Sequence, residues 1–168
     1  MERIVTSSML AHLRRHGAIS KQQHGFLSGR STSSNLLETL NDWTLAINDK
    51  KSVGVIYIDY AKAFDSVCHD KLLNKLAGYD IGGQLLKWVE SFLHDKTQQT
   101  RVGHTLSTSV ELTSGVVQGS VLGPLLFVLF INDITDLFNN SQCNCKLYAD
   151  DLKLYAVLET DSDCVTLQ

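Results

Sequence analysis

The sequence predicts an α+β domain in which helices pack on one face of an antiparallel sheet. The first indication is a run of β-branched and aromatic residues over 53–60, which is typical of a buried strand. The second is a pair of short alternating runs, 145–147 and 152–155, on either side of an acidic segment. This arrangement indicates a β-hairpin with its turn at 148–151. The third is the long segment between them, which carries helical patterns that can cover the sheet.

The composition is that of a folded domain. The chain has 168 residues, is 43% hydrophobic and contains one proline, which fits one domain or a piece of a larger protein. We find no apolar run of the ~18 residues that a membrane span needs, and the N-terminus has no signal-peptide pattern. The four cysteines form no paired framework and are expected to be reduced thiols. Cys143 and Cys145 are interpreted as strand residues rather than as part of a zinc site.

The charge is distributed unevenly along the chain. The formal net charge is −3, but residues 1–51 hold seven Lys/Arg and four Asp/Glu, whereas residues 52–168 hold eight and fourteen. Because contact with phosphate usually needs a basic surface, the first part is the expected basic part, and the second is the expected site for cations. Neither balance is large enough to assign a function by itself.

Helical spacing and polar breaks define the elements before the predicted strand. Val5, Met9 and Leu13 predict an amphipathic helix over 1–15. Residues 20–34 form a polar loop that ends in a Ser/Thr cluster able to cap the next helix. The buried stripe predicted for that helix, which extends from about residue 34 to 48, consists of Leu36, Leu40, Trp43, Thr44 and Ile47.

Two helices and a polar hairpin are expected after the strand. The first helix begins near Val67 and can be capped by Asp65 or Ser66. The stripe of the second helix consists of Leu85, Trp88, Val89, Phe92 and Leu93. Residues 97–114 then alternate as in a hairpin, with His104 exposed in its turn.

A loop with three glycines, over 114–124, leads into an apolar helix from about Leu122 to Leu137. Glycine-rich loops and helix N-termini allow close approach of a phosphate ligand, although a packing role explains these glycines better when the loop is taken alone. Arg30 lies just before the Ser/Thr cluster and is a second candidate phosphate contact. A solvated loop arginine is the alternative.

Three aspartates are the strongest functional signal. Two carboxylates such as those of Asp150 and Asp151, ~4 Å apart, repel by about 1 kcal/mol in water and by about 4 kcal/mol near a protein surface. Asp-Asp is also simply a good turn former. Asp59, however, ends a predicted strand, where an ionised carboxylate needs a partner or a metal. If this strand lies beside the hairpin, the three carboxylates suit two Mg²⁺ ions ~4 Å apart and phosphoryl or nucleotidyl transfer.

Four segments, in order along the chain, carry a resemblance to a known family. They are Gln23-His24-Gly25-Phe26 to Arg30-Ser31-Thr32, Asp59-Tyr60-Ala61-Lys62-Ala63-Phe64-Asp65, Gln118-Gly119-Ser120-Val121-Leu122-Gly123-Pro124-Leu125-Leu126-Phe127, and Tyr148-Ala149-Asp150-Asp151. With these segments the chain resembles the fingers–palm part of a reverse transcriptase from a non-LTR (LINE-type) retrotransposon, over nearly its whole length. The third segment is similar to jockey-like and chicken-repeat-like branches more than to group II intron or retroviral enzymes. The resemblance implies a polymerase palm with partial fingers.

The resemblance also implies roles for individual residues. Asp59 and Asp150 would be the principal ligands of two Mg²⁺ ions, with Mn²⁺ as an alternative ion. Asp151 would complete the triad, and the carbonyl of Tyr60 would be a further contact. Phe64 would exclude a 2′-hydroxyl because its flat ring would clash with it. The incoming nucleotide would contact Arg30, Gln118 and Gly119, and the primer end would lie near Tyr148.

The implied reaction is attack of a primer 3′-hydroxyl on the α-phosphate of a dNTP. The implied partners are therefore an RNA template, a DNA primer and dNTPs. No association with a membrane is expected. Residues 1–52 would be a partial fingers segment, and residues 53–168 a palm truncated before the thumb. The thumb and the endonuclease domain of the parent polyprotein are expected to be missing. The expected location is the nucleus or cytoplasm, with the retrotransposon ribonucleoprotein. Asp65 is expected to be structural, as a helix cap or loop anchor.

Three alternatives remain beside this interpretation. A degenerate palm could be kept as a binding or scaffold module without catalysis, although all three aspartates are present. A group II intron-like maturase is disfavoured by the form of the loop at Gln118. A nucleotidyl cyclase could share the acidic chemistry, but nothing in the sequence supplies its second set of motifs.

Overall fold

The computed structural model describes residues 1–139, 141–159 and 163. The chain divides into two compact units, one formed by Met1–Ala18 with Lys62–Phe130 and the other by Ile19–Ala61 with Ile131–Gln168. These boundaries differ from the division at residues 52 and 53 proposed from the sequence. The assignment of fingers and palm to the chain therefore stays a prediction.

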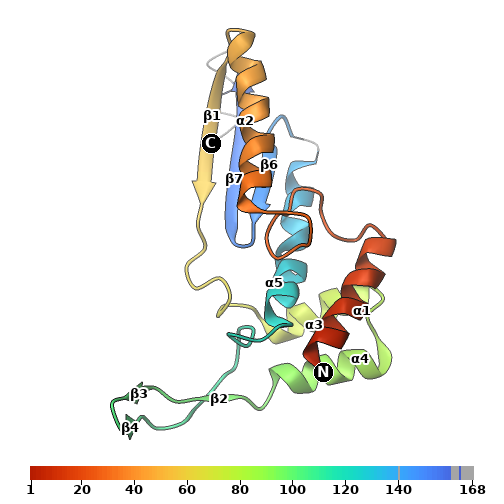
Figure 1. Cartoon of the computed structure of the whole chain (residues 1–168), viewed down its shortest axis with the longest axis vertical. Coiled ribbons are helices and arrows are strands. Elements are labelled where there is room, and N and C mark those ends of the chain that lie inside the picture. Colours follow the sequence, from red (N-terminus) through yellow and green to blue (C-terminus); the bar gives the residue numbers. More distant parts are fainter. Residues whose placement is uncertain (140, 160–162, 164–168) are drawn as a thin grey trace. The chain divides into compact units, whose positions relative to one another are not determined.

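The second unit contains a three-stranded antiparallel sheet (Figure 1). Its order is β1 (Ser52–Ile58), β7 (Asp151–Leu158) and β6 (Asn144–Tyr148). The hairpin predicted around the acidic segment is β6–β7, and the predicted strand lies directly beside it as β1. The antiparallel sheet and the α+β class are therefore confirmed.

One face of this sheet carries the apolar core of the second unit. Successive strand residues point to opposite faces, and the buried Leu147, Leu152 and Leu154 share one face. Ile134 and Phe138 of the 3₁₀ helix η1 (Asn132–Phe138) pack against them. The apolar helix predicted over 122–137 is thus divided between α5 (Gly123–Ile131) and η1.

The opposite face of the sheet is covered by α2 (Thr32–Asn48). Tyr155 of β7 donates a hydrogen bond to the carboxylate of Asp42 at 2.5 Å, and its ring meets Trp43 edge-on at 6.1 Å between centroids. Helical segments therefore lie on both faces, whereas the sequence led us to expect them on one.

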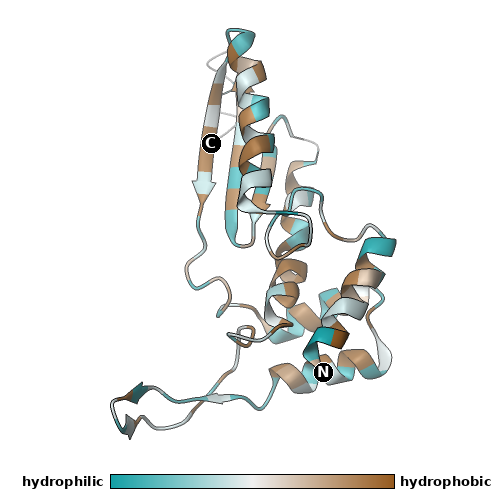
Figure 2. Ribbon diagram, viewed as in Figure 1, coloured by the Kyte–Doolittle hydropathy of each residue, from teal (hydrophilic) through white to brown (hydrophobic). Residues whose placement is uncertain are grey.

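α2 buries a different side from the one predicted. Its cap is as expected, because Ser31 accepts a hydrogen bond from the backbone N–H of Ser34 in a capping box. Its buried residues, however, are Asn35, Thr39 and Ala46. The exposed fractions of Leu36, Leu40 and Ile47 are 52%, 51% and 64%, so the predicted apolar stripe was wrong. Figure 2 shows apolar and polar segments mixed along the whole length of α2.

The first unit is mainly helical. It contains α1 (Glu2–Arg15), α3 (His69–Gly78), α4 (Gly83–Leu93) and most of α5. The helix that was expected near residue 67 begins after Cys68, which makes no side-chain capping bond, so the predicted cap by Asp65 or Ser66 was wrong. The buried apolar residues of α1, α3 and α4 include Met9, Leu13, Leu72, Leu76, Val89 and Leu93.

A polar hairpin extends from the first unit, as predicted. β2 (Thr97–Gln98) pairs with β5 (Val110–Glu111), and β3 (Arg101–Val102) pairs with β4 (Thr105–Leu106). Its turn at Gly103 and His104 is exposed.

Two composition-based expectations can also be compared with the structure. Cys68, Cys143 and Cys145 are free thiols, while Cys164 lies outside the described residues. None of the helices in the described part of the chain is both long enough and apolar enough to cross a bilayer.

Candidate active site

Two of the predicted aspartates meet at one end of the sheet in the second unit. Asp59 directly follows β1, and Asp151 is the first residue of β7. Because Ile58 pairs with Leu152, the next facing positions of this antiparallel ladder belong to Asp59 and Asp151. Both residues line one cavity of about 340 Å³, which we call the acidic cavity. Its other polar and aromatic lining residues are Thr32, Asn35, Tyr57, Lys146, Tyr148 and Lys153.

The third aspartate lies in the turn that joins β6 to β7. Tyr148 pairs with Asp151, which leaves Ala149 and Asp150 as the two turn residues. Ala149 has a φ of 57°, while Asp150 has a negative φ, and this combination fits a type II′ turn. We call residues 148–151 the acidic turn. It brings Asp150 next to Asp151 at the rim of the sheet, where Asp150 is half-buried.

The side chains at this end of the sheet offer oxygen ligands, which suit a hard divalent cation. The carboxylates of Asp59 and Asp151 are exposed oxygen donors, which Mg²⁺ prefers. Within residues 1–139, 141–159 and 163, however, no three His, Cys, Asp or Glu side chains are already arranged around a common metal position. The convergence of all three aspartates on shared ions therefore stays a prediction.

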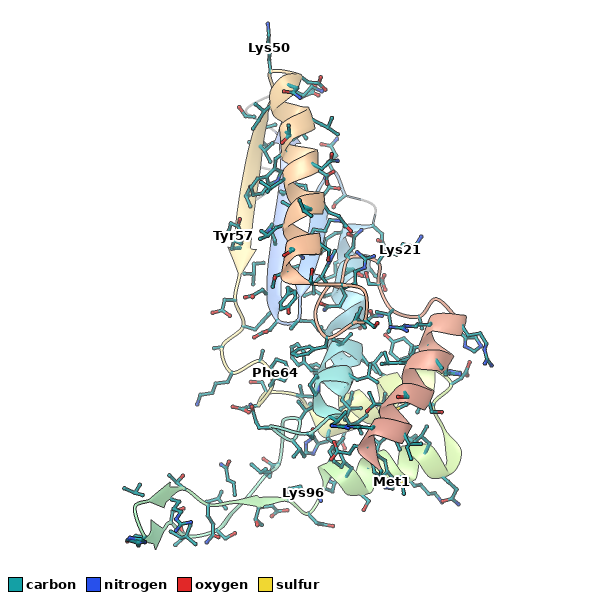
Figure 3. All side chains as sticks on the ribbon, viewed as in Figure 1. Met1, Lys21, Lys50, Tyr57, Phe64 and Lys96 are labelled. Carbon is teal, nitrogen blue, oxygen red and sulfur yellow. The ribbon has the colours of Figure 1, made fainter. Side chains whose placement is uncertain are left out.

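A buried lysine borders the acidic cavity. Lys153 lies opposite Tyr57 in the β1–β7 ladder and is only 8% exposed. Its Nζ donates to Asn35 and Thr39 of α2, both at 3.4 Å, and lies 5.6 Å from the centre of the Tyr57 ring (labelled in Figure 3). Burial lowers the pKa of Lys153. Lys153 was not foreseen, because only the fold shows that its partners come from α2.

Arg30 belongs to a polar network on the same unit. Its Nη1 donates to Glu38 at 2.9 Å and to Nε2 of the buried His24 at 3.2 Å. Glu38 also accepts a hydrogen bond from Lys146 at 2.5 Å, and this bond is the main reason why the pKa of Glu38 is lowered. Contact of Arg30 with a triphosphate stays a prediction, and such contact would compete with its bond to Glu38.

The remaining predicted residues lie in the first unit, apart from the exposed Tyr60, which lies two residues after β1. Phe64 (Figure 3) stacks on Phe127, with ring centres 4.1 Å apart and an angle of 15° between the rings. Gln118 donates to the carboxylate of Asp65 at 3.1 Å. Asp65 also accepts a hydrogen bond from the Ser114 hydroxyl through its backbone carbonyl, at 2.8 Å, so its expected role as a loop anchor is confirmed.

Gly119 is one of two positions in the glycine-rich loop where the backbone favours glycine, because its φ is 77°; the other is Gly115, with a φ of 91°. The predicted nucleotide-contacting role of Phe64, Gln118 and Gly119 stays a prediction. Gln23, which the sequence indicates only as part of a motif, is bound to Ala149 of the acidic turn by two hydrogen bonds. No local pattern could have revealed this, because its partner Ala149 is 126 residues away.

Solved structures with a similar fold include telomerases. The chain matches the apo telomerase of Candida tropicalis with a TM-score of 0.72 at 10% identity, over 98% of this chain and 32% of that one. It matches the telomerase of Candida albicans, solved with a fragment of telomeric RNA, with a TM-score of 0.69 at 14% identity, over 96% and 31%. At these identities the likeness shows the fold alone.

Similar sequences come from mobile elements. The chain is 34% identical to the RNA-directed DNA polymerase from mobile element jockey of Drosophila melanogaster, over 80% of this chain and 14% of the relative. It is 30% identical to the corresponding jockey protein of Drosophila funebris, over 98% and 18%. It is 28% identical to a probable RNA-directed DNA polymerase from transposon BS of Drosophila melanogaster, over 91% and 17%. The chain therefore spans less than a fifth of the length of these relatives.

The match to a family model extends over nearly all of the chain. Residues 1–166 match the model described as reverse transcriptase (RNA-dependent DNA polymerase). The acidic turn, the strand β1 with the Asp59 that follows it, and the glycine-rich loop all lie inside this match. The chain belongs to the reverse transcriptase family.

Proposed function

We propose that this chain is the fingers–palm part of an RNA-directed DNA polymerase from a non-LTR retrotransposon. The observation that carries the proposal is the placement of Asp59 and Asp151 at facing positions of two neighbouring strands, where both line the acidic cavity. The jockey relatives support the element type. Residues 1–52 would then be fingers and residues 53–168 palm. The protein would act inside the cell, with the retrotransposon ribonucleoprotein.

The proposed reaction joins the 3′-oxygen of a DNA primer to the α-phosphorus of a dNTP, and pyrophosphate leaves. Asp59, Asp150 and Asp151 would hold two divalent ions, with the Tyr60 carbonyl as a further ligand. When bound, such ions polarise the phosphoryl oxygens and neutralise charge on the attacking and leaving oxygens. The contribution of the protein is rigid placement, because phosphoryl transfer depends mainly on positioning and electrostatics.

Other residues would bind the substrates. Gln118 and Gly119 would lie against the incoming dNTP, Arg30 would contact its triphosphate, and Tyr148 would lie near the primer end. Phe64 would exclude the 2′-hydroxyl of a ribonucleotide. Its stacking on Phe127 supports this role, because a ring held in place excludes an added group more strictly than a mobile one.

Primer extension on poly(rA)/oligo(dT) with Mg²⁺ tests the proposal. Incorporation of dTTP by the chain that is abolished by Asp150→Asn would support the site assignment. The matched control is Asp95→Asn. Asp95 is exposed in the first unit and has a φ of 56°, a conformation that asparagine also adopts readily. Incorporation that survives Asp150→Asn would refute the site, and metal-dependent nucleotide binding without incorporation would favour a binding module.

A further inference from the structure

Gln23 directs its whole side-chain amide toward the acidic turn. It is 2% exposed. Its Oε1 accepts hydrogen bonds from the backbone N–H of Ala149 at 2.9 Å and of Gly25 at 2.7 Å. Its Nε2 donates to the carbonyl of Ala149 at 3.4 Å. One side chain thus binds both peptide groups of Ala149, the residue that precedes Asp150.

The backbone around Gln23 fixes this geometry. Gln23 forms an isolated parallel bridge with Leu147 of β6. The N–H of Leu147 donates to the Gln22 carbonyl, and the N–H of His24 donates to the Leu147 carbonyl, both at 2.9 Å. Asn35 of α2 donates to the same Leu147 carbonyl at 3.1 Å. The segment 22–24 therefore runs along β6 and ends beside the acidic turn.

The turn needs such support because its backbone is unfavourable. An L-residue in the left-handed region costs roughly 1 kcal/mol, and Ala149 has a φ of 57°. Gly25 lies so close that a Cβ on it would be 2.3 Å from the Ala149 nitrogen. The loop and the turn are thus in direct backbone contact, and the Gln23 amide links them.

We propose that Gln23 is a positioning residue that holds Ala149 in its turn conformation and thereby presents Asp150 and Asp151 for divalent-ion binding. This inference rests on the proposed function of the acidic turn. A merely structural role would stabilise the fold without changing ion affinity. A positioning role changes the affinity of a folded protein, and the two roles can therefore be measured separately.

The test uses Gln23→Met, which keeps the length of the side chain but removes its polar atoms. The matched control is Gln22→Met, because Gln22 contacts β6 through its backbone carbonyl. Amide hydrogen exchange of Ala149, followed by NMR without metal, reports directly whether Gln23 holds the backbone of Ala149. Titration with Mn²⁺ reports ion affinity, and circular dichroism verifies folding.

We expect Gln23→Met to accelerate Ala149 exchange and to weaken Mn²⁺ binding, each by about tenfold, the equivalent of roughly one buried hydrogen bond. Gln22→Met should change neither. Gln23→Glu retains an oxygen acceptor and should restore protection of the Ala149 amide. If Gln23→Met does not fold, Gln23→Asn, which is one methylene too short, should show the same two effects.

The possible outcomes separate this inference from the proposed function. If the folded Gln23 variants show unchanged Ala149 exchange and unchanged Mn²⁺ affinity while Asp150→Asn weakens Mn²⁺ binding, the positioning role of Gln23 is overturned. The proposed function is then unaffected. A wild-type chain that binds no Mn²⁺, or binds it equally well after Asp150→Asn, would overturn the proposed function and the inference with it.

Discussion

Asp59 and Asp151 occupy the facing positions one residue beyond the Ile58–Leu152 pair, and both line the acidic cavity. Like charges at one strand end repel, by about 4 kcal/mol at ~4 Å near a protein surface and by less at greater separation. Two lysines line the same cavity. Lys146 donates a hydrogen bond to Glu38, and Lys153 donates to Asn35 and Thr39 of α2. A cation from solution is therefore the counter-charge that this arrangement favours.

The first prediction concerns this repulsion. Without metal, Asp59→Asn should raise the free energy of unfolding by a few tenths of a kcal/mol up to about 1 kcal/mol, because it removes one of two like charges. With Mg²⁺, the wild-type chain should gain stability and the variant should gain less. Urea denaturation in EDTA and in Mg²⁺ measures both effects, with Asp95→Asn as the control. Equal gains from Mg²⁺ in the variant and the wild type would contradict the prediction.

The second prediction concerns the backbone contact between Gly25 and Ala149. A Cβ added at Gly25 would lie 2.3 Å from the Ala149 nitrogen and 2.9 Å from its Cα, and neither backbone atom can move without displacing the turn. Gly25→Ala should therefore lower the free energy of unfolding by about 1–3 kcal/mol. Gly78→Ala is the control, because a Cβ there meets nothing within 4 Å. Similar stabilities for the two variants would show that the loop and turn are not tightly packed.

The acidic hairpin could be predicted because its signal is local. Alternating residues on both sides of Asp150 define two strands, and their faces follow from the period of two. The cap at Ser31 was predictable for the same reason, since its partner is Ser34, three residues away. The apolar run that became β1 was also visible, because β-branched residues cluster in it.

The buried side of α2 and the role of Gln23 could not be predicted, because both depend on distant partners. Helical spacing favoured Leu36 and Leu40 as the buried residues of α2. The fold instead buries Asn35 and Thr39, which supply hydrogen-bond acceptors to Lys153, a residue more than 110 positions away. A buried ammonium group requires such partners, and this requirement overrides apolar periodicity.

The third prediction concerns the hydrogen bond from Tyr155 to Asp42. Burial is the main cause of the raised pKa of Tyr155, and the hydrogen bond to Asp42 raises it further. Tyr155→Phe keeps the ring against Trp43 and removes only the hydroxyl, so it should lower the free energy of unfolding by about 1–2 kcal/mol. Tyr57→Phe on the neighbouring strand should change little, because the Tyr57 side chain is 68% exposed. Chemical denaturation of both variants checks this.

A double-mutant cycle makes the same prediction specific to the pair. If Tyr155 and Asp42 stabilise the sheet–helix contact through their mutual bond, the effects of Tyr155→Phe and Asp42→Asn should not add. The coupling should be of the order of 0.5–1.5 kcal/mol. Additive effects would show that the 2.5 Å hydrogen bond between Tyr155 and Asp42 contributes no coupling free energy.

The fourth prediction concerns the protonation of His24. Burial is the main cause of its lowered pKa. The hydrogen bonds agree with a neutral ring, because Arg30 can only donate and Nε2 must therefore accept, which leaves Nδ1 to donate to Ser34 at 2.8 Å. Protonation would remove the acceptor and place a charge beside Arg30 and Lys146. The Glu38 carboxylate, 3.4 Å from Nε2, acts in the opposite direction and raises the pKa of His24, but it does not offset the effect of burial.

The lowered pKa of His24 predicts a loss of stability in mild acid. Below about pH 6.5 the unfolded chain binds a proton that folded His24 does not, so the free energy of unfolding falls with pH until the folded-state pKa is reached. The pKa of Glu38 is also lowered, but from 4.5, so its effect begins at lower pH. Urea denaturation between pH 7.5 and pH 5 should therefore show a steeper loss for the wild-type chain than for His24→Gln, by up to ~1.4 kcal/mol per pH unit. His104→Gln, which changes an exposed turn histidine, should retain the wild-type slope. An identical slope for His24→Gln would show that His24 takes up its proton as readily in the folded chain as in the unfolded one.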